Sequence, residues 1–471
     1  MRPLCGNKSS APLRLLHESA REIRRVKYHG EMMFAFRALK LAASLLTLGL
    51  VAAMAMSPQA MAAPANGPAT AVDWPHFRFN KAHTGNQPHE TALSKDTVKF
   101  AGPLWVADLP GELVFSSSPA VVKGVVYIGD SDGNLTAWPA AGCGAEECSA
   151  PLWQSTNLAQ IVDSPTVANG ILYIGSQTDF NDASGKLNAF KAKGCGKSVC
   201  APIWQGDAGP TSILESSPTV WNGTVFVGAY GGKLYAFNAD GCGQKLCQPI
   251  WTGEMGGTES TPLVYNGVVY IGSDDGHLYA FNAAGCGSAS CSPLWTGDTH
   301  GPVFDSSPAV SRGAIYIGSN HALSAFDAAG CGGVTCAALW QAIDDNEFFG
   351  GSPAVANGRV YIGLEAGVNV YRAKGCGQKT CRAIATLFGS GMQDGIGSSP
   401  TVANGVVYAG RNSGEVLAWN ADCRGTCSEL WKGLTDDPIV NSSPTVVNGT
   451  IYIGSSDHGF FGRLYVYGLT N

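Results

Sequence analysis

The stretch SSPTVWNGTVFVGAYGGKLYAFNADGCGQKLCQPIWTG, residues 216–253, contains the four short apolar runs PTV, TVFVG, KLYAF and PIWTG. These runs are too short for a typical helix, and they are rich in the branched and aromatic side chains that suit a pleated sheet. Asn-Gly, Gly-Gly and a Gly/Cys-rich segment separate them, and such dipeptides are typical of tight hairpin turns. The stretch therefore predicts a four-stranded antiparallel meander.

The same pattern recurs along the chain, each time opened by Ser-(Ser/Thr)-Pro or a close variant. The marker prolines stand about 46 residues apart, a spacing typical of propeller blades. One sheet of this kind has two faces to bury, and sheets packed face to face around an axis bury both. We therefore expect an all-β chain that forms an eight-bladed β-propeller of four-stranded antiparallel blades. The markers are Pro119, Pro165, Pro218, Pro262, Pro308, Pro353, Pro400 and Pro444.

The two ends of the repeat region predict how the ring closes. The last repeat stops after LYVYGL with only three strands, and residues 102–108, GPLWVAD, form an extra strand before the first repeat. We expect this N-terminal strand to complete blade eight, which leaves no open sheet edge at the seam. The predicted propeller spans residues 102–471, and residues 64–101 form an N-terminal extension that contains the DWPHFR segment.

The beginning of the chain predicts export. Residues 41–56 form an apolar core, and Ala-Met-Ala at 60–62 is a signal-peptidase-like site, so residues 1–63 read as a pre-sequence and secretory signal peptide. Its expected true start is Met32 or Met33. A membrane anchor is the alternative, but the core is shorter than the roughly 20 residues of a spanning helix. We expect a periplasmic or secreted monomer without a transmembrane anchor.

Charge and cysteine usage narrow the functional classes. The 471-residue chain has a net charge of −6 and no strongly basic domain, which does not suit a nucleic-acid binder. Of its 15 cysteines, Cys5 lies in the pre-sequence, and the rest form seven local pairs that predict disulfides in an exported protein. Zinc is the alternative, but each pair supplies only two ligands with no histidine nearby. The pairs are Cys143/Cys148, Cys195/Cys200, Cys242/Cys247, Cys286/Cys291, Cys331/Cys336, Cys376/Cys381 and Cys423/Cys427.

Each cysteine pair falls between the third and fourth predicted strands of a repeat. The ends of such a hairpin are already close together, so a bond between Cys242 and Cys247, or between Cys423 and Cys427, needs no rearrangement of the blade. We therefore expect all seven disulfides to act as staples of their own blades at the outer rim of the ring.

Two motifs carry a resemblance to a known family. Residues 234–251, LYAFNADGCGQKLCQPIW, and residues 73–86, DWPHFRFNKAHTGN, resemble the pyrroloquinoline-quinone-type (PQQ-like) propellers, which include an outer-membrane assembly scaffold and the body of quinoprotein alcohol dehydrogenases. The resemblance implies that a tryptophan of each fourth strand docks between neighbouring blades. The sixth repeat departs, because Ala385 stands at this position. The implied docking residues are Trp153, Trp204, Trp251, Trp295, Trp340 and Trp431.

The residues three before each marker proline are expected to surround one mouth of the channel. They are Ser116, Val162, Glu215, Glu259, Asp305, Gly350, Gly397 and Asn441. Three consecutive blades thus contribute the carboxylates of Glu215, Glu259 and Asp305, and oxygen ligands of this kind suit calcium. The alternative is a solvated acidic rim. Residues 177–185, QTDFNDASG, are a second candidate ion loop or a polar turn.

Two functions remain open at this point. The leading hypothesis is an exported, non-catalytic propeller that binds a protein or a cell-envelope partner as a scaffold module. The resemblance also implies a PQQ-dependent alcohol or sugar dehydrogenase, with quinone and calcium on the axis. The sequence gives that enzyme little support, because it lacks a vicinal Cys-Cys pair and long insertions between blades. No catalytic residue and no cofactor is assigned from the sequence; calcium at Glu215, Glu259 and Asp305 stays a candidate, and a PQQ site is disfavoured.

Overall fold

The computed structural model of the chain describes residues 72–470, except 112–113, 115, 179–183, 214, 345–347, 366, 391–394, 436 and 457–461. The predicted pre-sequence and its start at Met32 or Met33 lie outside the described residues. The described part consists of strands, turns and one short 3-10 helix, η1 (Val98–Phe100). A search of this part finds no helix with the length and apolarity of a membrane span.

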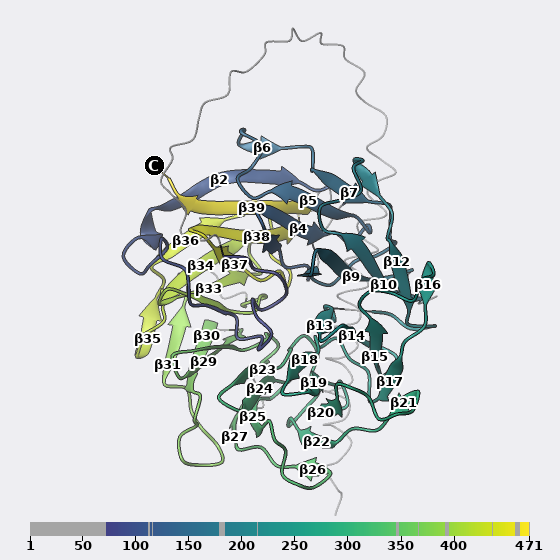
Figure 1. Cartoon of the computed structure of the whole chain (residues 1–471). Helices are drawn as coiled ribbons and strands as arrows, with labels where there is room; N and C mark the ends of the chain where they lie inside the picture. Colours follow the sequence, from purple (N-terminus) through teal and green to yellow (C-terminus); the bar gives the residue numbers. More distant parts are fainter. Residues whose placement is uncertain are drawn as a thin grey trace, which may run out of the picture. The chain divides into compact units, whose positions relative to one another are not determined.

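Eight sheets form the blades of the predicted propeller (Figure 1). In seven of the sheets four blade strands pair antiparallel in chain order, and the first strands of neighbouring blades contact one another around the axis. The first strands are β3 (Ala120–Val122), β8 (Thr166–Ala168), β13 (Thr219–Trp221), β18 (Leu263–Tyr265), β23 (Ala309–Ser311), β28 (Ala354–Ala356), β32 (Thr401–Ala403) and β37 (Thr445–Val447). The second strands are β4 (Val125–Gly129), β9 (Ile171–Gln177), β14 (Thr224–Ala229), β19 (Val268–Gly272), β24 (Ala314–Gly318), β29 (Arg359–Leu364), β33 (Val406–Arg411) and β38 (Thr450–Ser456).

The outer half of each blade follows the same order. The third strands are β5 (Leu135–Pro139), β10 (Gly185–Lys191), β15 (Lys233–Asn238), β20 (His277–Asn282), β25 (Ala322–Asp327), β30 (Gly367–Arg372), β34 (Glu415–Asn420) and β39 (Gly462–Leu469). The fourth strands of blades one to seven are β7 (Trp153–Ser155), β12 (Trp204–Asp207), β17 (Trp251–Glu254), β22 (Trp295–Asp298), β27 (Trp340–Ile343), β31 (Ala385–Phe388) and β36 (Trp431–Leu434). The fourth strand of the last sheet is β2 (Ala101–Asp108), which pairs antiparallel with β39.

Both faces of each blade are buried, because alternate residues of a strand point to opposite sides. In β14, Val225 and Val227 pack in the core shared with blade two, whereas Phe226 packs in the core shared with blade four. The Asn-Gly turns that join first and second strands need positive φ, and Asn222 and Gly223 adopt 45° and 79°. Apolar runs and turn residues thus produce the repeat locally.

The second residue of each Ser-(Ser/Thr)-Pro marker explains why the marker recurs. Its backbone N–H donates to the side-chain oxygen of the equivalent residue in the next blade, and the eight bonds form a closed ring. The donor residues, each followed by its acceptor as the next member, are Ser118, Ser164, Ser217, Thr261, Ser307, Ser352, Ser399 and Ser443, which donates back to Ser118. The marker therefore fastens the blades to one another around the axis.

The first residue of the marker fastens the blade to itself. The Gly228 N–H donates to Ser216 Oγ at 2.8 Å, and equivalent bonds occur in other repeats. In blade two this residue is Asp163, whose Oδ2 accepts from Gly175 at 2.7 Å while Oδ1 has no partner. Asp163 is 1% exposed, and burial raises its pKa well above the usual range. Blade two thus carries a buried carboxyl where a hydroxyl would suffice.

We expect Asp163→Ser to raise the free energy of unfolding by about 1–2 kcal/mol at pH 7, because serine keeps the acceptor for Gly175 and removes an unpaired buried oxygen. The reciprocal change Ser216→Asp should lower it. Urea unfolding of both variants checks the prediction. A raised folded pKa makes native stability fall as pH rises through it, so the gain should shrink below about pH 5. A less stable Asp163→Ser protein at pH 7 would contradict this account.

The structure contains the seven predicted disulfides, with Cα–Cα distances of 5.5–6.3 Å. Their loops do more than staple their own blade, because each reaches the rim of the preceding blade. Six form a fifth strand that pairs parallel with the fourth strand there, and the Cys376–Cys381 loop makes the bridge Gln341↔Thr380. The prediction of four strands per blade is therefore incomplete. The fifth strands are β6 (Glu147–Cys148), β11 (Val199–Cys200), β16 (Leu246–Cys247), β21 (Ser290–Cys291), β26 (Thr335–Cys336) and β35 (Gly425–Ser428).

The last disulfide differs from the other six in the length of its loop and in the burial of its second cysteine. In the other pairs the second cysteine is buried, whereas here Cys423 is 4% exposed and Cys427 is only half-buried, within β35. Cys423 follows its third strand where other repeats have a glycine, such as Gly241, whose Cβ would lie 2.8 Å from Trp204. Ala385 replaces that tryptophan in blade six and leaves room for the cysteine, which shortens the loop by one residue.

The N-terminal segment, residues 72–90, is bound along the first strands. It forms the bridge Trp74↔Val121 with blade one and accepts backbone hydrogen bonds from Val167 of blade two, Val310 of blade five and Val355 of blade six, at Pro75, Ala82 and Thr84 respectively. Its strand β1 (Asn86–Gln87) pairs with β32 of blade seven, and Glu90 accepts a hydrogen bond from Gly449 of blade eight. The predicted N-terminal extension therefore braces the inner wall of the ring.

Candidate functional site at the mouth of the channel

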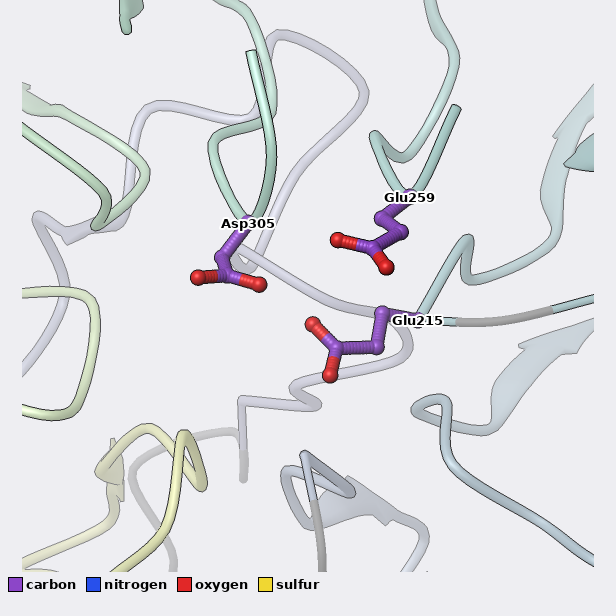
Figure 2. Close-up of side chains that lie close together, drawn as sticks. All are labelled: Glu215, Glu259 and Asp305. Atoms are coloured by element: carbon purple, nitrogen blue, oxygen red, sulfur yellow. The ribbon is translucent and has the colours of Figure 1, made fainter. Parts of the chain in front are cut away.

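Three carboxylates converge where consecutive blades begin. Glu215, Glu259 and Asp305 lie on neighbouring loops and point toward one another (Figure 2). Their ligand oxygens all lie within 4.8 Å of one another, and each side chain is partly exposed. Each residue directly precedes a marker serine that is bonded to its own blade, so the ring holds the three loops in place. The predicted juxtaposition of these three residues is thus present in the structure.

The electrostatics of this cluster are those of crowded negative charges. Removal from water raises the pKa of Glu215 well above its usual range, and the charges of Asp305 and Glu259 raise it further. The hydroxyl group of Ser116, from blade one, lowers the pKa of Glu215 and so acts in the opposite direction. Glu215 therefore holds a proton at a pH where an isolated glutamate is ionised. A bound cation would oppose this shift, because a nearby positive charge favours the ionised carboxylate.

The donor set fits a hard cation. Three carboxylates supply up to six oxygens, and calcium accepts six to eight oxygens in flexible geometry. Of the other predicted mouth positions, Ser116 and Asn441 adopt left-handed φ values of 61° and 57°, as Glu215 does at 54°. Val162, Gly350 and Gly397 have no side-chain ligand. Most of the second candidate loop, 177–185, lies outside the described residues, so no ion site is assigned there.

In the presence of a chelator, we expect Glu215 to make native stability fall as pH rises above the ordinary pKa of a glutamate, since the folded state then binds an extra proton. Glu215→Gln should reduce this slope, because an amide does not titrate. Calcium should restore stability at the upper end by pairing with the ionised cluster. Thermal unfolding across pH checks this, with the rim variant Glu146→Gln as control. An unchanged slope in Glu215→Gln would contradict the prediction.

The predicted docking tryptophans are buried between blades. Trp251 contacts Phe226 of its own blade and Phe281 of the next, with ring centroids 5.9 and 6.5 Å apart. Equivalent ring pairs surround Trp153, Trp295 and Trp340, while Trp204 contacts Tyr173 and Trp431 contacts Tyr467. The sequence analysis missed Trp105 of β2, which packs against Gly142 in the same manner. The signal was present, since GPLW repeats the SPLW of residues 292–295.

Blade six fills its missing tryptophan from the neighbouring blade. Trp419 of blade seven is fully buried beside Ala385, and its indole N–H donates to the Phe388 carbonyl at 2.8 Å. Arg359 donates to the carbonyls of Ala421 and Cys423 at 2.9 and 2.8 Å. In blades one and five the docking tryptophan makes a bond of this type, from Trp153 to Ala192 and from Trp340 to Ala373. Trp419 and Arg359 thus compensate for the departure in blade six.

The channel also holds a buried cationic group that was not predicted as a site. Arg78 is 2% exposed, none of its side-chain nitrogens has a partner, and burial lowers its pKa to about 9. His76 and His83 lie 5.9 Å apart by ring centroids, and burial lowers both pKa values. These residues belong to the DWPHFR motif and its continuation, which place them inside the ring.

Comparisons with known proteins agree with the class that the fold defines. Residues 201–330 match the family model described as outer membrane protein assembly factor BamB, of the PQQ-like repeat type. No curated protein matches the sequence. The chain is thus an eight-bladed β-propeller, and residues 201–330 of it are similar to the PQQ-like repeats of that family model.

Solved structures share the fold at low sequence identity. The crystal structure of BamB from Moraxella catarrhalis has 16% identity and a TM-score of 0.56 over 79% of this chain and 98% of that one. Quinohemoprotein alcohol dehydrogenase from Comamonas testosteroni has 14% identity and a TM-score of 0.63 over 84% and 80%. The computationally designed Ika8 protein has 15% identity and a TM-score of 0.55 over 77% and 100%. A fold shared by a scaffold factor, an enzyme and a designed protein does not define a function.

Proposed function

We propose that the chain is an exported, non-catalytic scaffold module that binds a protein or cell-envelope partner at its carboxylate mouth. The observation that carries this proposal is the binding of residues 72–90 to the first strands of blades one, two, five, six and seven and to the turn after β37 of blade eight. Because this segment occupies the inner wall of the ring, we expect the loops at the mouth of the channel to bind the partner. The disulfides and the BamB-type family match support an extracytoplasmic role with a protein partner.

The mouth specifies the chemistry of the partner surface. Glu215, Glu259 and Asp305 form a concentrated negative site on a rigid ring. A cationic side chain, or a calcium ion shared with the partner, would relieve the repulsion that raises the pKa of Glu215. The expected partner therefore presents Lys or Arg, or an acidic group that completes a calcium site.

Affinity capture from an envelope fraction tests the proposal, with the mature chain as bait. A specific partner should be retained by the wild type and lost by the triple variant Glu215→Gln, Glu259→Gln and Asp305→Asn. The rim variant Glu146→Gln with Glu147→Gln should keep it, because these residues are exposed on the first disulfide loop. Equal capture by all three proteins, or no specific partner, would refute docking at the mouth.

A PQQ-dependent alcohol or sugar dehydrogenase is the second candidate, favoured by the fit of the same three carboxylates to calcium. In such an enzyme these residues would hold the ion, and the bound quinone would supply the oxidising power. The test adds pyrroloquinoline quinone and calcium to the purified protein and follows alcohol-dependent dye reduction. Turnover that is lost in the triple variant would establish the enzyme and overturn the scaffold proposal.

A further inference from the structure

The junction of blades five and six carries a basic groove. The groove has a volume of about 1040 Å³, and its lining contains no Asp or Glu. Six cationic side chains from three blades line it, although the chain as a whole carries a net charge of −6. They are Arg312, Arg359, Arg372, Lys374, Lys379 and Arg424.

These cations are not neutralised by the protein. Among the described residues, no ion pair joins any of the six to a carboxylate. Arg359 and Lys379 donate to backbone carbonyls, which orients them without cancelling their charge. Arg359 and Arg372 are direct cross-strand neighbours, and like charges in this arrangement repel. The groove therefore holds repulsion that an anionic ligand would relieve.

The repeat supplies an internal comparison. At the next junction, the positions of Arg312, Arg359, Arg372 and Lys374 are taken by Asn357, Val406, Asn420 and Asp422, as strand register shows. The junction of blades five and six is therefore more positively charged than the next junction, although both have the same strand pattern. Arg359 has a structural role, because it donates to carbonyls of blade seven. Arg372 and Lys374, in contrast, are exposed, where their charges can contact a ligand.

We propose that this groove binds a ligand with two or more phosphoryl groups. Arginine forks match phosphate oxygens in pairs, and lysines bind phosphate as point charges. Two phosphoryl groups concentrate three to four negative charges in a volume that the groove accommodates, whereas single carboxylates carry one each. This inference goes beyond the proposed function and is independent of the carboxylate mouth.

Isothermal titration calorimetry of sodium tripolyphosphate binding to the full mature protein tests the proposal. The variant Arg372→Gln with Lys374→Gln should weaken binding by about tenfold or more, since it removes two charge-assisted contacts. The matched control is Lys191→Gln with Lys193→Gln, because the sequence FKAKGC at 190–195 repeats YRAKGC at 371–376. In that repeat the cross-strand neighbour of Lys191 is Ile171, which stands at the position of Arg359. The control should change binding by less than about twofold, and rising salt should weaken all binding.

Vesicles distinguish the source of the phosphoryl groups. Flotation with cardiolipin, against phosphatidylcholine alone, reports a lipid head group, and tripolyphosphate reports a free ligand. Either result supports the proposal if it depends on Arg372 and Lys374. Binding of neither probe, equal loss in the two paired variants, or equal affinity for citrate would overturn it. The four side chains that are changed are all exposed, and thermal unfolding verifies that each variant is folded.

Discussion

Trp251→Ala is expected to lower the free energy of unfolding by about 3–5 kcal/mol, the cost of deleting a large buried aromatic side chain. Trp251 is 4% exposed and packs between Phe226 and Phe281. The next blade approaches it at Gly285, where a Cβ would lie 2.8 Å from the indole. Because the two blades pack tightly around the indole, the substitution leaves a cavity that neither blade can fill without moving. Urea unfolding of the mature protein measures the effect.

Two controls separate docking from general loss of apolar area. Leu294→Ala, in the following repeat, removes a side chain that is 49% exposed and should change stability by less than about 0.5 kcal/mol. Trp251→Phe keeps an aromatic ring and should fall between the two. If Trp251→Ala is no less stable than Leu294→Ala, the tryptophans do not hold the blades together.

Removal of one disulfide is expected to cost about 2 kcal/mol, the chain-entropy value for a loop of this length. The double variant Cys242→Ser with Cys247→Ser tests one loop. The structure gives a second reason for a loss, because β16 at the end of this loop pairs with β12 of the preceding blade. Freeing the loop therefore weakens the rim contact between two blades. Reduction of all seven bonds should lower the melting temperature by far more than one double variant.

Thiol titration and a matched variant make this prediction decisive. The mature protein, denatured without reductant, should show no free thiol, because the unpaired Cys5 precedes the predicted cleavage site. Gln244→Ala changes the same exposed loop without breaking its bond and should leave stability within about 0.5 kcal/mol. A reduced protein as stable as the oxidised one would show that the loops do not fasten the rim.

The sequence predicted the blades well because their signals are local. Four apolar runs, an Asn-Gly turn and a marker proline lie within one repeat, and each acts on neighbouring residues. The fifth strands escaped prediction for the opposite reason. The pairing of Leu246 with Gln205 joins segments about 40 residues apart, and nothing in the loop's own sequence indicates its partner. The shallower burial of Cys427 likewise depends on a residue of another blade, Ala385.

The carboxylate mouth was predictable because equivalent residues of a closed repeat meet at the axis. Glu215, Glu259 and Asp305 needed only the register of the marker prolines. Arg78 and Trp419 did not follow this rule, since one lies on a segment outside the repeat and the other substitutes for a residue of a different blade. The basic groove was missed because its cations are single residues spread from 312 to 424.

The amino-acid sequence alone determined the number of blades, their strand order and the cysteine pairs, since each depends on periodicity or on residues close in the chain. Tertiary structure decided how closely the three carboxylates approach one another and which blade rim each disulfide loop contacts. It also brought six cationic side chains together around one groove. The physical reason is that the rotation and packing of neighbouring sheets set distances between side chains of different blades. Those distances follow from closure of the ring rather than from any single repeat.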